Sequence, residues 1–307
     1  MENRDKKWLW AAFVLILAGA VLIAVTSVIY QAQGGMMMSD GFSFGGFMEQ
    51  TALKNEKKFE AEGIHSIEIE YSSPDVIFYA GDTDKIEIKE YLRNRTENAE
   101  IKVEGDTLVC RGGKSNWSFL GGRPEKIEVY LPSDYAGQLQ LSTTSGNIDS
   151  EEAWSMEEFE ADSTSGNITV GAVTASKIEI STTSGNIRFE KAAGELKVKA
   201  TSGNIDMGGI AGKCVASASS GNIDLEADEL NGDMEVQTSS GNMNLILPEN
   251  SSFTYKGSAS SGDIHTSFDE SLHFNEKGNR AEGTYGADAV IRISTSASSG
   301  NTRVKFR

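Results

Sequence analysis

Along residues 139–307, apolar and polar positions alternate on both sides of a short polar corner that keeps returning. The corner is the tripeptide Ser-Gly-Asn, or once Ser-Gly-Asp, and its copies begin at Ser145, Ser165, Ser184, Ser202, Ser220, Ser240, Ser261 and Ser299. Successive copies lie 18 to 21 residues apart, except the last two, which lie 38 apart. A repeat of this length indicates stacked supersecondary units, and the doubled gap predicts a degenerate copy near residue 280.

The alternation has a period of two residues, which is the period of a β-strand. Positions six and four residues before each corner Ser are mostly apolar. The position three residues after that Ser holds Ile148, Ile168, Ile187, Ile205, Ile223, Met243, Ile264 and Thr302. A helical solenoid would need a period of about 3.6 residues. If each coil stacks in parallel on the one before it, equivalent positions of successive repeats form columns, and each column stays apolar or polar throughout. The sequence therefore predicts an all-β parallel β-helix, or β-solenoid.

The corner residues have structural roles in such a stack. Gly tolerates positive φ, which lets the chain turn sharply, and an Asn amide can donate to one coil while accepting from the next. We therefore expect an amide ladder, of the kind that stacked parallel strands favour. Its members are Asn147, Asn167, Asn186, Asn204, Asn222 and Asn242. The alternative is a binding motif displayed on a loop, but the inward columns stay apolar while the outward ones vary, which favours the structural role.

One outward column is a candidate contact surface. The residue before each corner is Thr or Ser, and a row of hydroxyl groups could contact a glycan. The first four members of this column are Thr144, Thr164, Thr183 and Thr201. Ordinary solvated faces of strands explain the column equally well.

Residues 59–138 are strand-like but lack the Ser-Gly-Asn corner. Terminal units of solenoids are often atypical because they cap an open end. We therefore expect irregular cap coils over 59–138, with a β-hairpin at 99–110, before the repeat coils of 139–307. The two cysteines do not make a disulfide framework, and Cys214 falls in an inward apolar column.

Residues 8–30 contain no charged side chain, and as a helix they would be roughly 34 Å long, enough to span a bilayer. Arg4, Lys6 and Lys7 precede this segment, whereas residues 31–53 contain no Lys or Arg. The positive-inside rule then predicts a single-pass cell-membrane protein with residues 1–7 in the cytoplasm, a transmembrane helix over 8–30, a Gly-rich tether over 31–58 and an extracytoplasmic domain over 59–307. A cleaved signal peptide is the alternative, but its apolar run would be shorter.

Composition excludes several functions. The chain of 307 residues has 45 acidic and 28 basic side chains, a net charge of -17, which argues against nucleic acid as a partner. Three histidines and two cysteines leave little for metal, cofactor or acid–base chemistry, and no catalytic, cofactor or metal residue is predicted. A polysaccharide lyase or hydrolase is the enzymatic alternative, with Arg188, Asp206 and Asp224 as neighbours on one outward column, although Arg–Asp pairing between coils explains that column without catalysis.

The chain resembles a bacterial family of unknown function, the putative-adhesin β-strand-repeat proteins. The resemblance rests on the N-terminal anchor, SSPDVIFYAGDTDKIEI at 72–88, IEVYLP at 127–132 and the serial T-x-SGNI corners, and it covers about residues 60–307. It implies a β-helical extracytoplasmic domain and, for some members, a link to envelope-stress operons. It supplies no catalytic or ligand-binding residue.

The sequence and this resemblance together predict a membrane-anchored, adhesin-like surface module without catalysis. Its expected partners are the membrane and either an envelope glycan or another surface protein. The alternatives are an accessory or sensor protein of an envelope-stress system and the β-helix lyase or hydrolase already named.

The topology can be tested with protease added to intact, wall-stripped cells. Because residues 59–307 are expected outside the membrane, the protease should digest this domain or release it at the tether, as seen by immunoblotting of the cells and the medium. Complete protection of the domain in intact cells, with digestion only after lysis, would contradict the topology.

Overall fold

The computed structural model describes residues 51–93, 96–113 and 124–307, and in these ranges the chain is an all-β solenoid. Its strands pair in parallel between successive coils, which confirms the predicted fold class for this part of the chain. Within the same ranges no helix is long and apolar enough to cross a membrane. The predicted transmembrane segment, residues 8–30, lies outside them.

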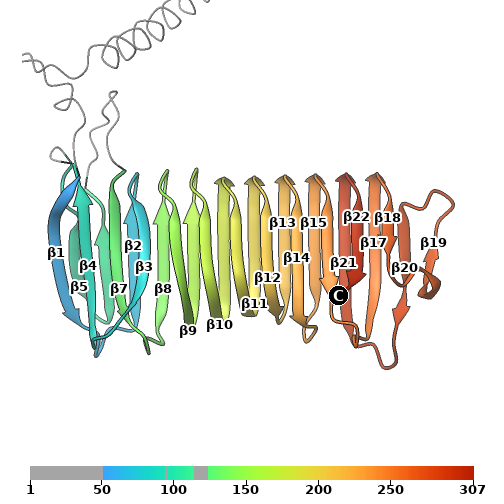
Figure 1. Ribbon diagram of the computed structural model, residues 1–307, viewed down its shortest axis with the longest axis horizontal. Helices are drawn as coiled ribbons and strands as arrows, with labels where there is room; N and C mark the ends of the chain where they lie inside the picture. Colours follow the sequence, from blue (N-terminus) through green and yellow to red (C-terminus); the bar gives the residue numbers. More distant parts are fainter. Residues whose placement is uncertain (1–50, 94–95, 114–123) are drawn as a thin grey trace, which may run out of the picture. The chain divides into compact units, whose positions relative to one another are not determined.

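The central coils turn at the predicted corners. Their strands are β8 (Gln138–Thr143), β9 (Ile148–Ser163), β10 (Ile168–Ser184), β11 (Ile187–Ser202), β12 (Ile205–Ala211), β13 (Cys214–Ser220), β14 (Ile223–Glu229), β15 (Met234–Ser240) and β16 (Met243–Leu247). Segments that precede a corner stack on one another, and segments that follow a corner do the same (Figure 1). We name these two stacks the before-corner sheet and the after-corner sheet.

The apolar columns form the core. In the after-corner sheet Ile168 pairs with Ile187, and Ile187 pairs with Ile205, and all three side chains are fully buried. The parallel register keeps each inward position above its counterpart, so the period-two pattern becomes a continuous apolar interior. Cys214 lies in this interior, as the sequence predicts, and both cysteines are free thiols.

The corner glycines are required because a side chain would have no room. A Cβ atom at Gly166 would come within 3.0 Å of the Gly146 carbonyl oxygen. A Cβ atom at Gly203 would come equally close to the Gly185 carbonyl oxygen. The expected reason, positive φ, applies only to later corners such as Gly221, where φ is 150°. Close approach of one corner to the next is therefore the constraint that all these glycines share.

The N-terminal region is more regular than the sequence predicts. Its strands are β1 (Ala52–Glu60), β2 (Ser66–Tyr71), β3 (Asp75–Gly81), β4 (Lys85–Leu92), β5 (Glu100–Glu104), β6 (Thr107–Arg111) and β7 (Lys126–Pro132). β2 and β3 form a coil whose corner is Ser73-Pro74-Asp75, because Tyr71 pairs with Thr143 and Val76 pairs with Ile148. Residues 59–138 thus contain a corner, which the search for Ser-Gly-Asn missed because Pro stands in place of Gly.

The coil order at this end differs from the chain order. β2 lies between β6 and β8, and β3 lies between β7 and β9, so the coil made by β6 and β7 is the outer one. β4 pairs antiparallel with β7, and β1 pairs antiparallel with β4 to extend the sheet further. β5 pairs with β6 in the predicted hairpin. The predicted tether is too long, since residues 52–58 lie in β1. Residues 54–58 of this strand are all polar, so no alternation of apolar and polar positions reveals it in the sequence.

The C-terminal coils are also out of order. Their elements are β17 (Phe253–Ser261), β18 (Ile264–Thr266), a 3-10 turn (Asp269–Ser271), β19 (Leu272–Phe274), β20 (Arg280–Tyr285), β21 (Ile291–Ser299) and β22 (Thr302–Phe306). β21 pairs with both β15 and β17, and β22 pairs with both β16 and β18, so the last coil is inserted between two earlier ones (Figure 1).

The predicted degenerate corner near residue 280 is wrong. Residues 280–285 form β20, which runs antiparallel to β17 and caps the before-corner sheet. The gap of 38 residues is long because it contains this cap and not a second coil. Phe268 closes the core at this end, with its ring 5.1 Å from that of Phe253 and 5.5 Å from that of Phe306, measured between centroids.

Replacing Gly203 by Ala should destabilise the fold strongly, because the new Cβ would meet the backbone of the preceding corner and the coils would have to separate. We expect a loss of about 3 kcal/mol in the free energy of unfolding, measured by urea denaturation. The control is Ser202→Ala at the adjacent exposed position, which should change stability by less than about 0.5 kcal/mol. Equal stability of the two variants would contradict the steric role of the corner.

Candidate functional site

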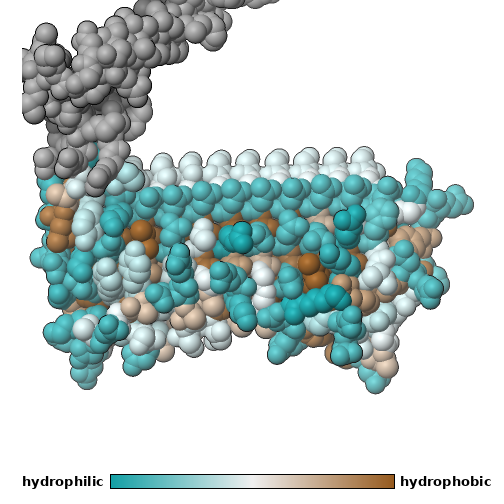
Figure 2. All heavy atoms as spheres, viewed as in Figure 1, coloured by the Kyte–Doolittle hydropathy of each residue, from teal (hydrophilic) through white to brown (hydrophobic). Residues whose placement is uncertain are grey.

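The corners place a row of exposed polar side chains along one edge of the solenoid. Thr144, Thr164, Thr183 and Thr201 are all exposed, and each is followed by an exposed corner Ser. Figure 2 shows this edge as an even row of pale residues with a row of hydrophilic residues beside it. We name the exposed Thr, Ser and Asn residues of the corners the corner ridge. Because neighbouring strands lie about 4.8 Å apart, the ridge presents its polar groups at that interval.

The predicted asparagines lie in one row of the ridge and are held by hydrogen bonds. The Oδ1 atom of each accepts the backbone N–H of the Asn in the next coil, at 2.9 Å from Asn147 to Asn167 and 3.0 Å from Asn186 to Asn204. The row starts at Asp75, whose Oδ1 accepts the Asn147 N–H at 2.8 Å. It continues through Asn242 and the inserted coil, where Asn301 accepts the N–H of Asp263 at 3.0 Å. The dominant bond therefore joins a side chain to the backbone, whereas the expected bonds between amide groups are the longer ones, at 3.2 to 3.4 Å.

Two kinds of corner hydroxyl are present, and only one is available to a ligand. The inward hydroxyls hold the turn: the Gly146 N–H donates to Thr143 Oγ1 at 3.0 Å, and the Gly166 N–H donates to Ser163 Oγ at 2.7 Å. The outward hydroxyls of the candidate column make no hydrogen bond with another residue in the part of the chain that the structure describes. These outward groups are therefore free to contact a partner.

In the candidate catalytic column, Arg188 and Asp206 form an ion pair, and Asp224 forms none among the described residues. Arg188 pairs in register with Asp206, and Asp206 pairs with Asp224. The Arg188 guanidinium lies 3.2 Å from the Asp206 carboxylate, and both side chains are more than half exposed. Such a pair on an open sheet contributes little energy and has no wall to exclude water. Among the described residues, no group of three or more His, Cys, Asp or Glu side chains could hold a metal ion.

The buried thiols are unsuited to nucleophilic chemistry. Burial raises the pKa of Cys214 to about 12, and burial also raises the pKa of Cys110 to about 12, although a 3.2 Å hydrogen bond with the Tyr71 hydroxyl acts in the opposite direction. Both groups are therefore neutral near pH 7, whereas a nucleophilic cysteine needs the thiolate.

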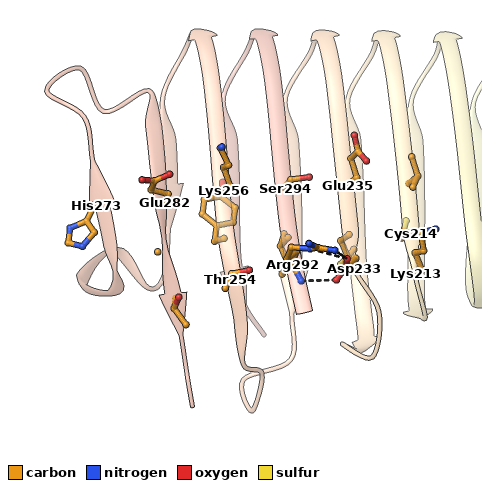
Figure 3. A pocket seen from close by; sticks show the side chains of 16 residues that line it. Lys213, Cys214, Asp233, Glu235, Thr254, Lys256, His273, Glu282, Arg292 and Ser294 are labelled. Carbon is orange, nitrogen blue, oxygen red and sulfur yellow. Dashed lines mark hydrogen bonds and ion pairs between the residues drawn. The ribbon is translucent and has the colours of Figure 1, made fainter. Parts of the chain in front are cut away.

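A groove on the before-corner sheet was not predicted. It crosses β15, β21, β17 and β20 and has a volume of about 690 Å³. One row of side chains runs across it, in the order Glu235, Ser294, Lys256, Glu282 and His273 (Figure 3). Below this row Arg292 of the inserted coil binds Asp233, with 3.0 Å between Nη2 and Oδ2. The sequence spacing gives no sign of the groove, because it depends on the order in which the last coils stack.

A family model described as Toastrack DUF4097 matches residues 64–305 of the chain. Among solved structures, the chain is similar to a "putative adhesin" from Bacteroides fragilis NCTC 9343, with 15% identity, a TM-score of 0.47, and coverage of 84% of this chain and 99% of that one. It is also similar to a "putative adhesin" from Parabacteroides distasonis ATCC 8503, with 11% identity, a TM-score of 0.43, and coverage of 83% and 99%. A "putative lipid binding protein" from the same organism has 15% identity and a TM-score of 0.42, with coverage of 81% and 96%. No curated protein matches the chain.

Replacing Asn222 by Ala should remove the acceptor for the Asn242 backbone N–H and lower the free energy of unfolding by about 1 kcal/mol. Replacing it by Asp keeps that acceptor, as Asp75 does at the first corner, and should cost less. Urea denaturation of the two variants measures the difference. An Asp variant as unstable as the Ala variant would show that the acceptor atom is not what stabilises the row.

Proposed function

The chain belongs to the Toastrack DUF4097 family, and on that premise we propose that it is a membrane-anchored interaction module of the cell surface that binds its partner without catalysis. The uncharged segment 8–30, with basic residues before it, supports the anchor, and residues 59–307 are then extracytoplasmic. The partner class that fits best is an envelope glycan.

The corner ridge is the observation that carries this proposal. It offers hydroxyl and amide groups at every corner, and the Asn hydrogen bonds fix their positions before a partner arrives. A prearranged surface loses little conformational entropy on binding. A polymer with repeating hydroxyl groups can contact many corners at once, so contacts that are weak singly add up along the edge, and several tethered copies add avidity.

The chemistry of the described residues supports binding without turnover. The two cysteines of the chain are neutral and buried, and the Arg188–Asp206 pair is open to water on a flat face. A hydrolase or lyase needs a nucleophile or base with an orienting partner inside a cleft. The ridge instead resembles an extended contact surface.

The ridge can be tested by replacing Thr164, Thr183 and Thr201 together. Val keeps the shape of Thr but removes the hydroxyl, so the triple Val variant should lose roughly half or more of its binding to insoluble wall glycan in a co-sedimentation assay. The triple Ser variant keeps the hydroxyls and serves as the matched control, with binding close to that of the unchanged chain. Equal binding by all three proteins would rule out the ridge, and shortening of the glycan during the assay would overturn the non-catalytic proposal.

A further inference from the structure

A second groove lies on the after-corner sheet, beside the C-terminal end of the corner ridge. Its volume is about 480 Å³, and its lining includes Asn222, Asn242, Asn301, His265, Arg303 and Lys305. Asn244 and one carboxylate, Asp224, complete its polar lining. The three asparagines belong to the row that forms the ridge, so one wall of the groove is continuous with it. The inserted coil supplies Asn301, Arg303 and Lys305.

Among the described residues, Arg303 and Lys305 are cations without an acidic partner. In the parallel register, Arg303 lies between Asn244 and His265, and Lys305 lies beside Ile246. Neither side chain forms an ion pair with any residue of 51–93, 96–113 or 124–307. By contrast, Arg188 occupies the same column and is paired with Asp206. Asp224, the one acid of the lining, is separated from Arg303 by the strand of Asn244, and the two cations outnumber it. The groove therefore carries available positive charge in a chain whose net charge is -17.

The groove also offers hydrogen-bonding groups that the fold does not use. In the coils of Asn167, Asn186 and Asn204, the Nδ2 group donates to the preceding Asn. The Nδ2 groups of Asn222, Asn242 and Asn301 make no such bond in the described part of the chain.

One acceptor completes this set. The Oδ1 atom of Asn244 is buried and has no hydrogen-bond partner among the described residues. A buried acceptor left unpaired is costly, so rotation of this half-buried amide toward a ligand hydroxyl in the groove gains a hydrogen bond that the fold does not supply.

We propose that this groove binds the acidic units of a polyhydroxylated polymer, with a carboxylate held by Arg303 and Lys305 and a sugar hydroxyl donating to Asn244 Oδ1. Arg is suited to this role because its guanidinium can bind a carboxylate through two parallel hydrogen bonds. The three Asn Nδ2 groups donate to further ligand oxygens. The negative charge of the chain as a whole repels dense polyanions, so the groove should prefer a ligand that combines acid groups with hydroxyls.

This proposal rests on the proposed function, since it names the chemical class of glycan that the C-terminal part of the ridge selects. A polymer lying along the ridge would reach the groove at Asn222. The ridge would then supply contacts to any hydroxylated chain, and the groove would add discrimination for an acidic one.

The test measures binding of the purified full-length chain to three probes by isothermal titration calorimetry. Oligogalacturonate carries carboxylates and hydroxyls, a dextran oligomer carries hydroxyls alone, and inorganic polyphosphate carries negative charge without hydroxyls. The variant R303Q/K305Q should weaken the Kd for oligogalacturonate about tenfold or more and leave dextran binding unchanged. The control R188Q/K191Q also removes one Arg and one Lys charge from the after-corner sheet, but these two cations already lie near Asp206 and Asp228. Its Kd for oligogalacturonate should stay within about twofold of that of the unchanged chain.

Each outcome separates the groove from the ridge. An R303Q/K305Q variant that folds, by circular dichroism, and binds oligogalacturonate normally overturns the groove proposal. Polyphosphate binding as tight as that of oligogalacturonate overturns it too, because a plain charge patch would suffice. Failure of the unchanged chain to bind oligogalacturonate has the same consequence. If the unchanged chain does not bind dextran but binds oligogalacturonate in a way that depends on Arg303 and Lys305, the ridge proposal is overturned and the groove proposal stands.

Discussion

The structure depends on how closely one corner approaches the next. At the repeat corners a glycine lies against the carbonyl oxygen of the adjacent corner, with no space for a Cβ atom. This contact fixes the spacing of the coils and, with it, the register of both sheets. The register decides which side chains point inward to the apolar columns and which point outward. The Asn row and the exposed hydroxyls follow from the same alignment, so the steric demand of one small residue also determines the surface that a partner meets.

The outward faces of the two sheets differ in how many of their charged side chains are paired with an opposite charge. Along the before-corner sheet, opposite charges follow one another, as in the pairs of Glu195 with Lys213 and Asp233 with Arg292, at 2.6 and 3.0 Å. These pairs stand one above another and favour the observed register, although each contributes little on an exposed face. Arg303 is on the same inserted coil as Arg292 but lies between Asn244 and His265, neither of which is acidic. Two arginines 11 positions apart thus have different roles, because their neighbours come from coils that are far away in the sequence.

The sequence was enough to predict the features that depend on local periodicity. The buried Ile column, Cys214 in the core and the alignment of the asparagines all follow from strands that alternate in and out around a fixed corner. The first corner was missed because Pro74 replaces the signature glycine, although Ile67, Ile69 and Val76 stand at the expected inward spacings. Both grooves were missed because they depend on the stacking order of the last coils, and spacing along the chain carries no information on that order. The residues that line them looked like ordinary surface positions.

The inserted last coil has a consequence for how the protein folds. A repeat protein whose coils stack in chain order can fold progressively from its N-terminal end, and its last unit is then free to fray. Here β21 and β22 are flanked by strands on both sides, and Arg292 reaches Asp233 across 59 residues of sequence. Contacts between such distant positions form slowly because the intervening loop must close first. The coil pair of β17 and β18 cannot take its final place until the C-terminal residues arrive beside it. Completion of the solenoid therefore waits for β21 and β22, which join two units that precede them in sequence.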